Sequence, residues 1–317
     1  MDKQLELSLY KDGYHIEETD CWHMPLACTA GYYDFYYYQM FLFYTSIQIN
    51  WKEEVNDLEN LNRFGLDYIS CKVTEKSSLI PKIREYINRE VPVILKVHYS
   101  TLFFAYEQYK RSNLEHGILI AGYDDSREII QTREWAHNYM NYPELNGGGL
   151  PKLWLADYVI EKMAWDSAEK FFHEPYVELV SVEENYELVS IPTVRSAIEE
   201  WICILEGQNS NLEKVVNSFN QVLQKNLNFD MKRFISTYIN SLHIPFDIIG
   251  KYTATDEVKQ FEQYYISGRK QIVNVLIKLF ISKIELSAEN MEMYQKQNLK
   301  LDSELRSFLI KINEQLD

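Results

Sequence analysis

The sequence predicts an α+β domain followed by a helical region. Up to residue 188, short apolar runs bounded by turn residues, which are typical of β-strands, alternate with segments of helical periodicity. From Thr193 onward the apolar residues recur mostly at helical spacing. The character of the chain changes around Ser190-Ile191-Pro192, so we expect one domain over residues 1–188 and a second over 189–317.

In the first domain, apolar runs between turn residues predict strands at residues 5–9, 66–73, 93–97, 118–121, 128–131 and 176–182. A long buried helix is expected over residues 21–47, because its large apolar side chains recur at helical spacing: Tyr33, Tyr36, Tyr37, Met40, Phe41 and Tyr44. Further helices are expected at 77–88 and 153–165. The glycine-rich segment 133–150 lacks the pattern of a phosphate-binding loop and is expected to be a surface loop or lid.

In the second domain, helices are expected at residues 194–205, 212–223, 229–242, 256–266, 269–286 and 288–316. Residues that disfavour helix separate them, namely Gly207, the segment 226–228, Pro245, Gly250 and Gly268. The segment 272–284 is apolar on most sides, so we expect it to be buried.

Composition excludes several classes of protein. The chain carries 47 acidic and 32 basic residues, a net charge of −15, and has no dense basic run, which disfavours nucleic-acid binding. No apolar run approaches the ~18 residues that a membrane span needs, and no charged-then-apolar leader begins the chain, so we expect a cytoplasmic protein without a membrane partner. The four cysteines show neither paired nor zinc-ligand spacing, so we expect free thiols, no metal and no cofactor.

Cys21 is the candidate nucleophile. It follows an acidic, turn-like segment and begins the predicted helix 21–47, in which Pro25 fits the first turn. Unpaired N–H groups and the helix dipole favour a thiolate over a thiol at such a position. Cys28 lies two turns deeper in the same helix and is expected to be a packed core thiol.

His116 is the candidate general base. It opens an apolar strand that leads into Gly122-Tyr123-Asp124, 95 residues after Cys21. A strand that faces a helix N-terminus holds an imidazole within reach of a thiol, as nucleophilic cysteine catalysis requires. His98, near the end of the preceding strand, is the rival base, but it lacks the Gly-Tyr-Asp context.

These two motifs resemble those of the BtrH-like cysteine acyltransferases of natural-product biosynthesis, whose catalytic domain has the papain-like fold in its C39-peptidase-like form. In that family the cysteine opens a helix that carries a Tyr-Tyr pair, matched here by Tyr32-Tyr33, and the histidine block matches His116 to Asp124. The resemblance covers roughly residues 14–135. It implies a papain-like catalytic domain with a helical C-terminal region.

The resemblance also implies an oxyanion hole. C39-like relatives carry a glutamine six residues before the cysteine, and that position is His15 here. His15 and the Cys21 backbone N–H would then stabilise the oxyanion.

The sequence departs from the family at the residue that orients the histidine. The next strand usually supplies an Asp or Asn, whereas the corresponding segment here contains Arg133, whose side chain has no acceptor for an imidazole N–H. Three alternatives stay open: Glu134 substitutes, an acid such as Glu285 or Glu289 arrives from elsewhere, or the enzyme works as a dyad.

The resemblance implies transfer of an acyl or peptidyl group from the phosphopantetheine thioester of a carrier protein to an amine, a diamine among the candidates, with formation of an amide. Glu17, Glu18 and Asp20 lie within four residues of Cys21 and are candidates for attracting a cationic amine. A C39-like peptidase or thioester hydrolase would use the same residues, and a non-catalytic binding protein is the third alternative.

Overall fold

The computed structural model describes residues 2–7, 14, 20–52, 54–104, 115–133, 152–185, 189–207, 239–282 and 288–316. The chain divides into two compact units. The first comprises the described residues of Met1–Ile16, Asp20–Phe41 and Asp57–Val189, and the second comprises those of Leu42–Asn56 and Ser190–Asp317. The stretch Leu42–Asn56, which the sequence pattern assigns to the first domain, therefore belongs to the second unit.

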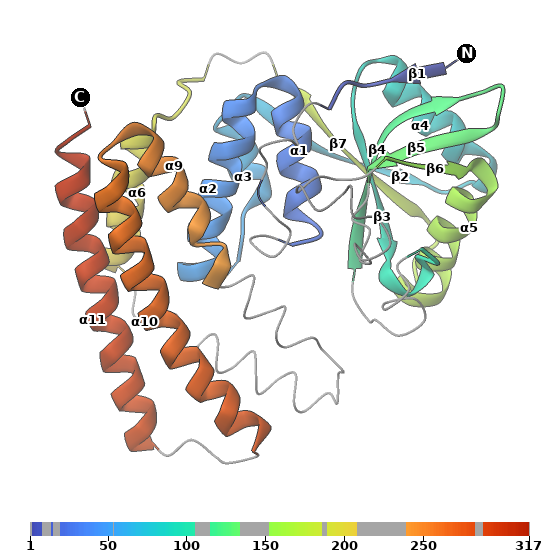
Figure 1. Ribbon diagram of the computed structural model, residues 1–317. Helices are drawn as coiled ribbons and strands as arrows, with labels where there is room; N and C mark the ends of the chain where they lie inside the picture. Colours follow the sequence, from blue (N-terminus) through green and yellow to red (C-terminus); the bar gives the residue numbers. More distant parts are fainter. Residues whose placement is uncertain are drawn as a thin grey trace. The chain divides into compact units, whose positions relative to one another are not determined.

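The first unit is an α+β structure built on a seven-stranded antiparallel sheet (Figure 1). Six strands follow one another across the sheet in the order β2 (Leu66–Val73), β7 (Val177–Glu184), β3 (Val93–His98), β4 (Glu115–Asp124), β5 (Ile129–Arg133) and β6 (Lys152–Ala156). The seventh, β1 (Asp2–Gln4), pairs with the end of β4. Within the described ranges β5 pairs with β4 only from Leu119 onward, which leaves the first residues of β4 without a strand on that side.

Helices cover both faces of this sheet (Figure 1). On one face α4 (Leu79–Asn88) and α5 (Asp157–Ser167) enclose the apolar core, because alternate residues of β3 and β4 point toward them. On the other face α1 (His23–Tyr33) packs against β3, β4 and β7, and α3 (Asp57–Asn62) packs against β2. The hydroxyl of Tyr33 ties α1 to β7 by donating to the carbonyl oxygen of Val182 at 2.7 Å.

Most predicted elements of the first unit are confirmed, and three predictions are wrong. The first strand is Asp2–Gln4, while Leu5 and Leu7 are buried outside any strand. The predicted helix 21–47 is two helices, because Asp34 adopts extended backbone between α1 and α2 (Phe35–Trp51). The predicted helix 153–165 begins as strand β6 and becomes helical only at Asp157. The predicted loop 133–150 lies, after Arg133, outside the described residues.

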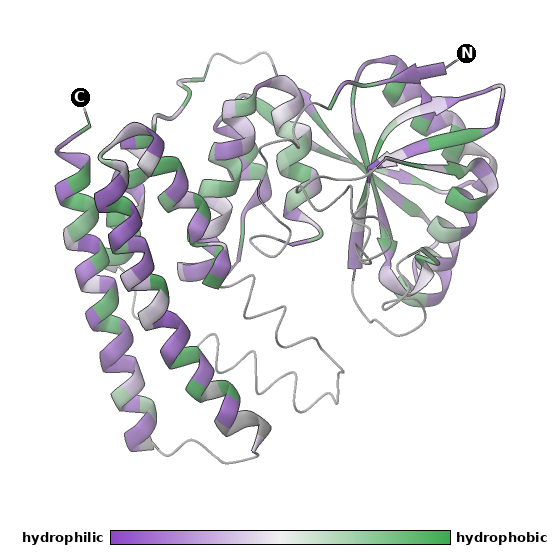
Figure 2. Ribbon diagram, viewed as in Figure 1, coloured by the Kyte–Doolittle hydropathy of each residue, from purple (hydrophilic) through white to green (hydrophobic). Residues whose placement is uncertain are grey.

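The second unit is helical in its described residues. It contains the C-terminal part of α2 with α6 (Val194–Gly207), α9 (His243–Tyr252), α10 (Thr255–Ile281) and α11 (Ala288–Asn313). Figure 2 shows hydrophobic and hydrophilic residues alternating along α10 and α11, as expected for amphipathic helices. Aromatic rings form much of the core, with Trp201 contacting Phe43, Trp51 and Phe246.

Several predicted helix breaks in this unit are wrong. Pro245 lies in the first turn of α9, where a missing N–H costs nothing, and Gly250 lies in the same helix. α10 runs straight through Gly268, where a Cβ would come within 2.9 Å of the Leu301 side chain, so the glycine permits close helix packing. Ile272 and Val273 are buried, but Asn274 and Lys278 are exposed, so the segment 272–284 is not buried on all sides. The predicted helix 212–223 and most of 229–242 lie outside the described residues.

Within the described ranges we find no helix whose length and apolar character together would let it span a bilayer.

Candidate active site

Cys21 lies in the turn that leads into α1. The helix begins at His23, two residues later than predicted, so Cys21 precedes the first helical residue and is partly buried. Asp20 caps this turn, because its Oδ1 accepts the backbone N–H groups of Trp22 at 2.9 Å and His23 at 2.8 Å. The cysteine is thus held in a turn at the N-terminus of α1, two residues before the first residue of the helix, which the sequence pattern starts at Cys21.

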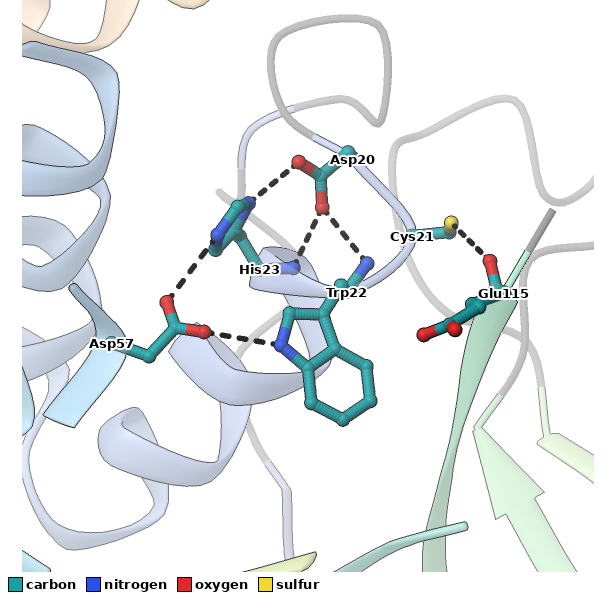
Figure 3. Close-up of polar contacts among 6 residues, drawn as sticks. All are labelled: Asp20, Cys21, Trp22, His23, Asp57 and Glu115. Atoms are coloured by element: carbon teal, nitrogen blue, oxygen red, sulfur yellow. Dashed lines mark hydrogen bonds and ion pairs between the residues drawn. The ribbon is translucent and has the colours of Figure 1, made fainter. Parts of the chain in front are cut away.

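The backbone places Cys21 directly against the start of β4. Its carbonyl oxygen accepts the N–H of Gly117 at 3.4 Å. Its thiol donates to the carbonyl oxygen of Glu115 at 3.6 Å (Figure 3). These are the two neighbours of His116. The turn therefore occupies the side of β4 that β5 does not reach in the described residues.

His116 is completely buried on β4, opposite Val97 of β3. Its ring lies 4.2 Å, centroid to centroid, from the ring of Tyr99, and its side chain shares the α4/α5 face with Ile118 and Ile120. The candidate base therefore lies between the two residues that contact Cys21, and the Cys21 thiol itself donates to the carbonyl oxygen of Glu115.

His98, the rival candidate for the general base, contacts other residues than Cys21. It is opposite Glu115 in the register of β3 and β4, so its side chain points to the face opposite that of His116. Its ring stacks on Phe171 with centroids 4.0 Å apart, and its Nδ1 accepts the N–H of Ser100 at 3.3 Å. The ring thus caps a turn and packs against an aromatic residue.

The candidates for the third member are only partly described. Arg133 is opposite Leu119, three residues along β4 from His116, so the residue level with His116 lies beyond the described end of β5. Glu134 and Glu285 lie outside the described residues. Glu289 is exposed in the first turn of α11, in the second unit.

The acidic segment before Cys21 is described only at its end. The predicted oxyanion donor His15 and two of the acids predicted to attract an amine, Glu17 and Glu18, lie outside the described residues. Asp20 has both oxygens engaged by backbone N–H groups and by His23. Asp20 therefore stabilises the turn before α1.

His23 is a site residue that the sequence analysis did not identify. It lies between two carboxylates, with Nδ1 at 2.5 Å from Asp20 Oδ2 and Nε2 at 3.3 Å from Asp57 Oδ1 (Figure 3). Burial lowers the pKa of His23, but the two carboxylates outweigh it and raise that pKa well above the ordinary value of 6.5. The side chain is therefore an imidazolium that bridges Asp20 and Asp57 next to the cysteine.

Trp22 completes this network. Its indole N–H donates to Asp57 Oδ2 at 3.1 Å, and its ring lies over Gly117, where a Cβ would come within 3.2 Å of it. The spacing of Asp20 and His23, three residues apart, is a pairing signal in the sequence, whereas nothing local points to Asp57, 37 residues after Asp20.

The described residues contain no cluster of His, Cys, Asp and Glu side chains with the geometry of a metal site. Comparison of the chain with protein-family models gives no match, and comparison with curated proteins gives none either.

Proposed function

We propose that the protein is a cysteine acyltransferase that moves an acyl or peptidyl group from a carrier-protein thioester to an amine. The observation that carries this proposal is the contact of Cys21 with both neighbours of His116, through the Gly117 N–H and the Glu115 carbonyl oxygen. Nucleophilic thiol catalysis needs a thiol and a histidine on elements that hold them together. The turn before α1 carries the thiol and the start of β4 carries the histidine, and the contact between these two elements supports the proposal.

The reaction follows from these two side chains. The thiol turns from the Glu115 carbonyl to His116 and gives up its proton, and the sulfur attacks the thioester carbonyl carbon. The bond to the phosphopantetheine sulfur breaks, and this leaving thiol takes the proton from His116. A neutral amine then attacks the Cys21 thioester, an amide forms, and the amine proton returns through His116 to the Cys21 sulfur.

The fold supports the papain-like part of the proposal. The cysteine precedes a helix that packs on an antiparallel sheet, and the histidine stands at the start of a strand in that sheet. The protein is proposed to act in the cytoplasm, on a carrier protein and an amine.

The test is incubation of the protein with an octanoyl N-acetylcysteamine thioester, followed by intact-mass measurement. Wild-type protein should gain one octanoyl group, and addition of hexane-1,6-diamine should remove it with release of the amide. Cys21→Ala should gain none, whereas Cys203→Ser, which changes an exposed thiol of the second unit, should behave as wild type. His116→Gln should slow acylation by roughly 10²–10⁴-fold, the usual effect of losing a general base.

Two outcomes would overturn the proposal. Release of free octanoic acid at a rate independent of the amine would identify a hydrolase of the C39-peptidase type. An unmodified Cys21 with both this thioester and a carrier-bound one would identify a binding protein without acyl chemistry.

A further inference from the structure

A small hollow lies at the end of the sheet and shares one residue, Glu115, with the contacts of Cys21. It encloses about 290 Å³ between β3, β4, β7 and the segment that follows α5, and its walls include Lys96, Glu115, Phe171, Phe172, Glu174, Tyr176 and Glu178. Glu115 is the link to the candidate active site, because its carbonyl oxygen accepts the Cys21 thiol while its side chain faces Lys96 in the hollow. Glu115 therefore contacts the candidate nucleophile through its backbone and lines the hollow with its side chain.

The charges in the hollow favour a cation. Three carboxylates, those of Glu115, Glu174 and Glu178, line it together with a single ammonium, that of Lys96. Nζ of Lys96 lies 3.2 Å from Glu115 and 3.4 Å from Glu178. Burial lowers the pKa of Lys96, but these carboxylates outweigh it and raise that pKa. The hollow thus already stabilises one ammonium and retains negative charge.

Aromatic rings form the opposite wall. Nζ of Lys96 lies 5.5 Å from the centre of the Phe172 ring, within the range of a cation–π interaction. The ring of Phe171 stacks in parallel on the ring of His98, with the centroids 4.0 Å apart. Carboxylates facing aromatic rings are the chemistry that recognises an alkylammonium group, since the rings also accept its methylene chain.

The backbone that presents these rings is unusual. Ala168–Phe172 forms a π-helical turn after α5, and the next residue, His173, has a left-handed conformation with φ 56°. A π-helical turn is rare, and a left-handed conformation is rare for a residue other than glycine. Both features occur preferentially at functional sites. A regular helix would continue the α5 geometry and would place the two phenylalanines elsewhere.

We propose that this hollow binds the amine acceptor through its ammonium end, and that the acceptor is a short alkyl diamine. Two amino groups are needed because one must stay protonated between the carboxylates and the rings while the other, neutral, attacks the acyl group on Cys21. The volume suits a small, narrow molecule and not a drug-sized one. The role as acceptor site rests on the proposed acyltransferase function, whereas the binding of the diamine does not.

Binding is measured by isothermal titration calorimetry of the full chain with hexane-1,6-diamine, and hexane-1,6-diol serves as the uncharged probe. The diamine should bind and the diol should bind at least ~10-fold more weakly, because a charge-assisted hydrogen bond and a cation–π contact depend on the ammonium. Glu178→Gln should weaken diamine binding by roughly 10-fold, while its amide oxygen can still accept from Ser70. The matched control is Glu169→Gln, which makes the same charge change in the π-helical turn at an exposed residue paired with Lys76, and it should leave affinity unchanged.

A variant that should strengthen diamine binding distinguishes a ligand site from a cluster of ion pairs that serves only the fold. Lys96→Met removes the resident ammonium and leaves Glu115 and Glu178 for the ligand, so diamine affinity should rise several-fold. Phe172→Leu should weaken binding and Phe172→Tyr should restore it. Equal binding of diol and diamine, or loss of affinity in Lys96→Met with an unchanged melting temperature, would overturn the site.

The two proposals fail in different ways. Diamine binding that obeys these variants, without acyl transfer, would overturn the enzyme and keep the cation site. Acyl transfer whose diamine KM is unchanged by Glu178→Gln would keep the enzyme and overturn the acceptor site.

Discussion

His23 controls the turn that carries Cys21, because its charge holds Asp20 and Asp57 together. We predict that its ring, followed by the Cε1–H proton in NMR titration, has a pKa well above 6.5 in the folded protein. Asp20→Asn should lower this pKa, since it removes the nearer carboxylate but retains a good helix cap. An unchanged value in Asp20→Asn would show that Asp20 is not the partner.

The same pair makes stability depend on pH. Folding lowers the pKa of Asp20 from 3.8 to about 2, despite burial, because His23 interacts with the carboxylate. The stability that Asp20 adds is therefore present above about pH 3.8 and is lost as pH falls through about 2. Folding raises the pKa of His23, so its contribution is full below about pH 6.5 and is lost as pH rises through the raised value.

The difference in melting temperature between wild type and Asp20→Asn should thus be largest between about pH 4 and pH 6.5. The lowering of the Asp20 pKa would correspond to roughly 2 kcal/mol of folding stability if the carboxylate were fully shielded from water. Because about a third of the Asp20 side chain is exposed, we expect a stability difference on the order of 1 kcal/mol. A difference that grows steadily toward alkaline pH would contradict this assignment.

The sequence predicts those site residues that have a recognisable pattern among their neighbours in the chain. Cys21 before a helix and His116 at the start of a strand are visible because cap, turn and strand signals surround each of them. Asp57 cannot be predicted from the sequence, because only the folding of α3 beside α1 brings it to His23 and Trp22. Lys96 and Glu178 likewise meet only through the register of β3 and β7.

Between elements, the turn before α1 contacts β4 through Gly117. A Cβ there would come within 2.9 Å of Ile94 Cγ2 and 3.2 Å of the Trp22 ring, so Gly117→Ala must move the Ile94 side chain and press on Trp22, the neighbour of Cys21. We predict a loss of roughly 1–3 kcal/mol in stability and a changed rate of Cys21 alkylation by iodoacetamide, followed by mass spectrometry.

Gly122→Ala is the matched control on the same strand. Its Cβ would come within 2.6 Å of the Lys3 carbonyl oxygen, so it disturbs β1 and not the Cys21 turn. This variant should lose stability but keep the wild-type alkylation rate. Equal effects of the two glycine variants on Cys21 would exclude a specific role for Gly117.

In the second unit, Arg269 of α10 is a buried charge. Its guanidinium contacts Asn298 and Asp302 of α11 at 3.0 and 3.5 Å and Asn50 of α2 at 3.4 Å. Arg269→Leu leaves Asp302 buried without its cation, so we expect a loss of about 3–5 kcal/mol in calorimetric unfolding. Arg306→Leu, which breaks the exposed pair with Glu206, should change stability by less than about 1 kcal/mol.

The element boundaries that the sequence misses have local causes. Asp34 ends α1 and caps α2 by accepting the Tyr36 N–H at 2.8 Å, but the apolar periodicity continues across it and predicts one helix. β6 is hidden because Lys152–Ala156 leads directly into α5, so the apolar pattern of both elements reads as one helix. Gly268 reads as a break, yet in α10 it is a packing site for Leu301.

Each of the two units is built from separate segments of the chain, so no single position in the sequence divides them. α2 contributes its first residues to one unit and the residues from Leu42 onward to the other. In the second unit Phe43 and Trp51 pack on Trp201, and Ile47 is buried. Composition locates the change at residue 189, but it does not reveal that an earlier helix is shared.

A fragment of residues 1–189 should therefore aggregate, because removal of residues 190–317 takes away the rest of the second unit and exposes the apolar side chains of 42–51. Size-exclusion chromatography of the fragment should show large species. Replacement of Phe43, Ile47 and Trp51 by Gln in the same fragment should restore a monomer. A monomeric unmodified fragment would show that the first unit does not need this segment covered.

The π-helical turn Ala168–Phe172 determines the direction in which Phe171 and Phe172 point. A π-turn is an α-helix with one residue inserted, and each residue of an α-helix rotates its successors by about 100°. Deletion of Glu169 would restore the regular helix and turn Phe171 and Phe172 away from Lys96. A variant without Glu169 would keep the residues of the sheet and of the Cys21 turn but would lose the aromatic wall beside the carboxylates of Glu115 and Glu178.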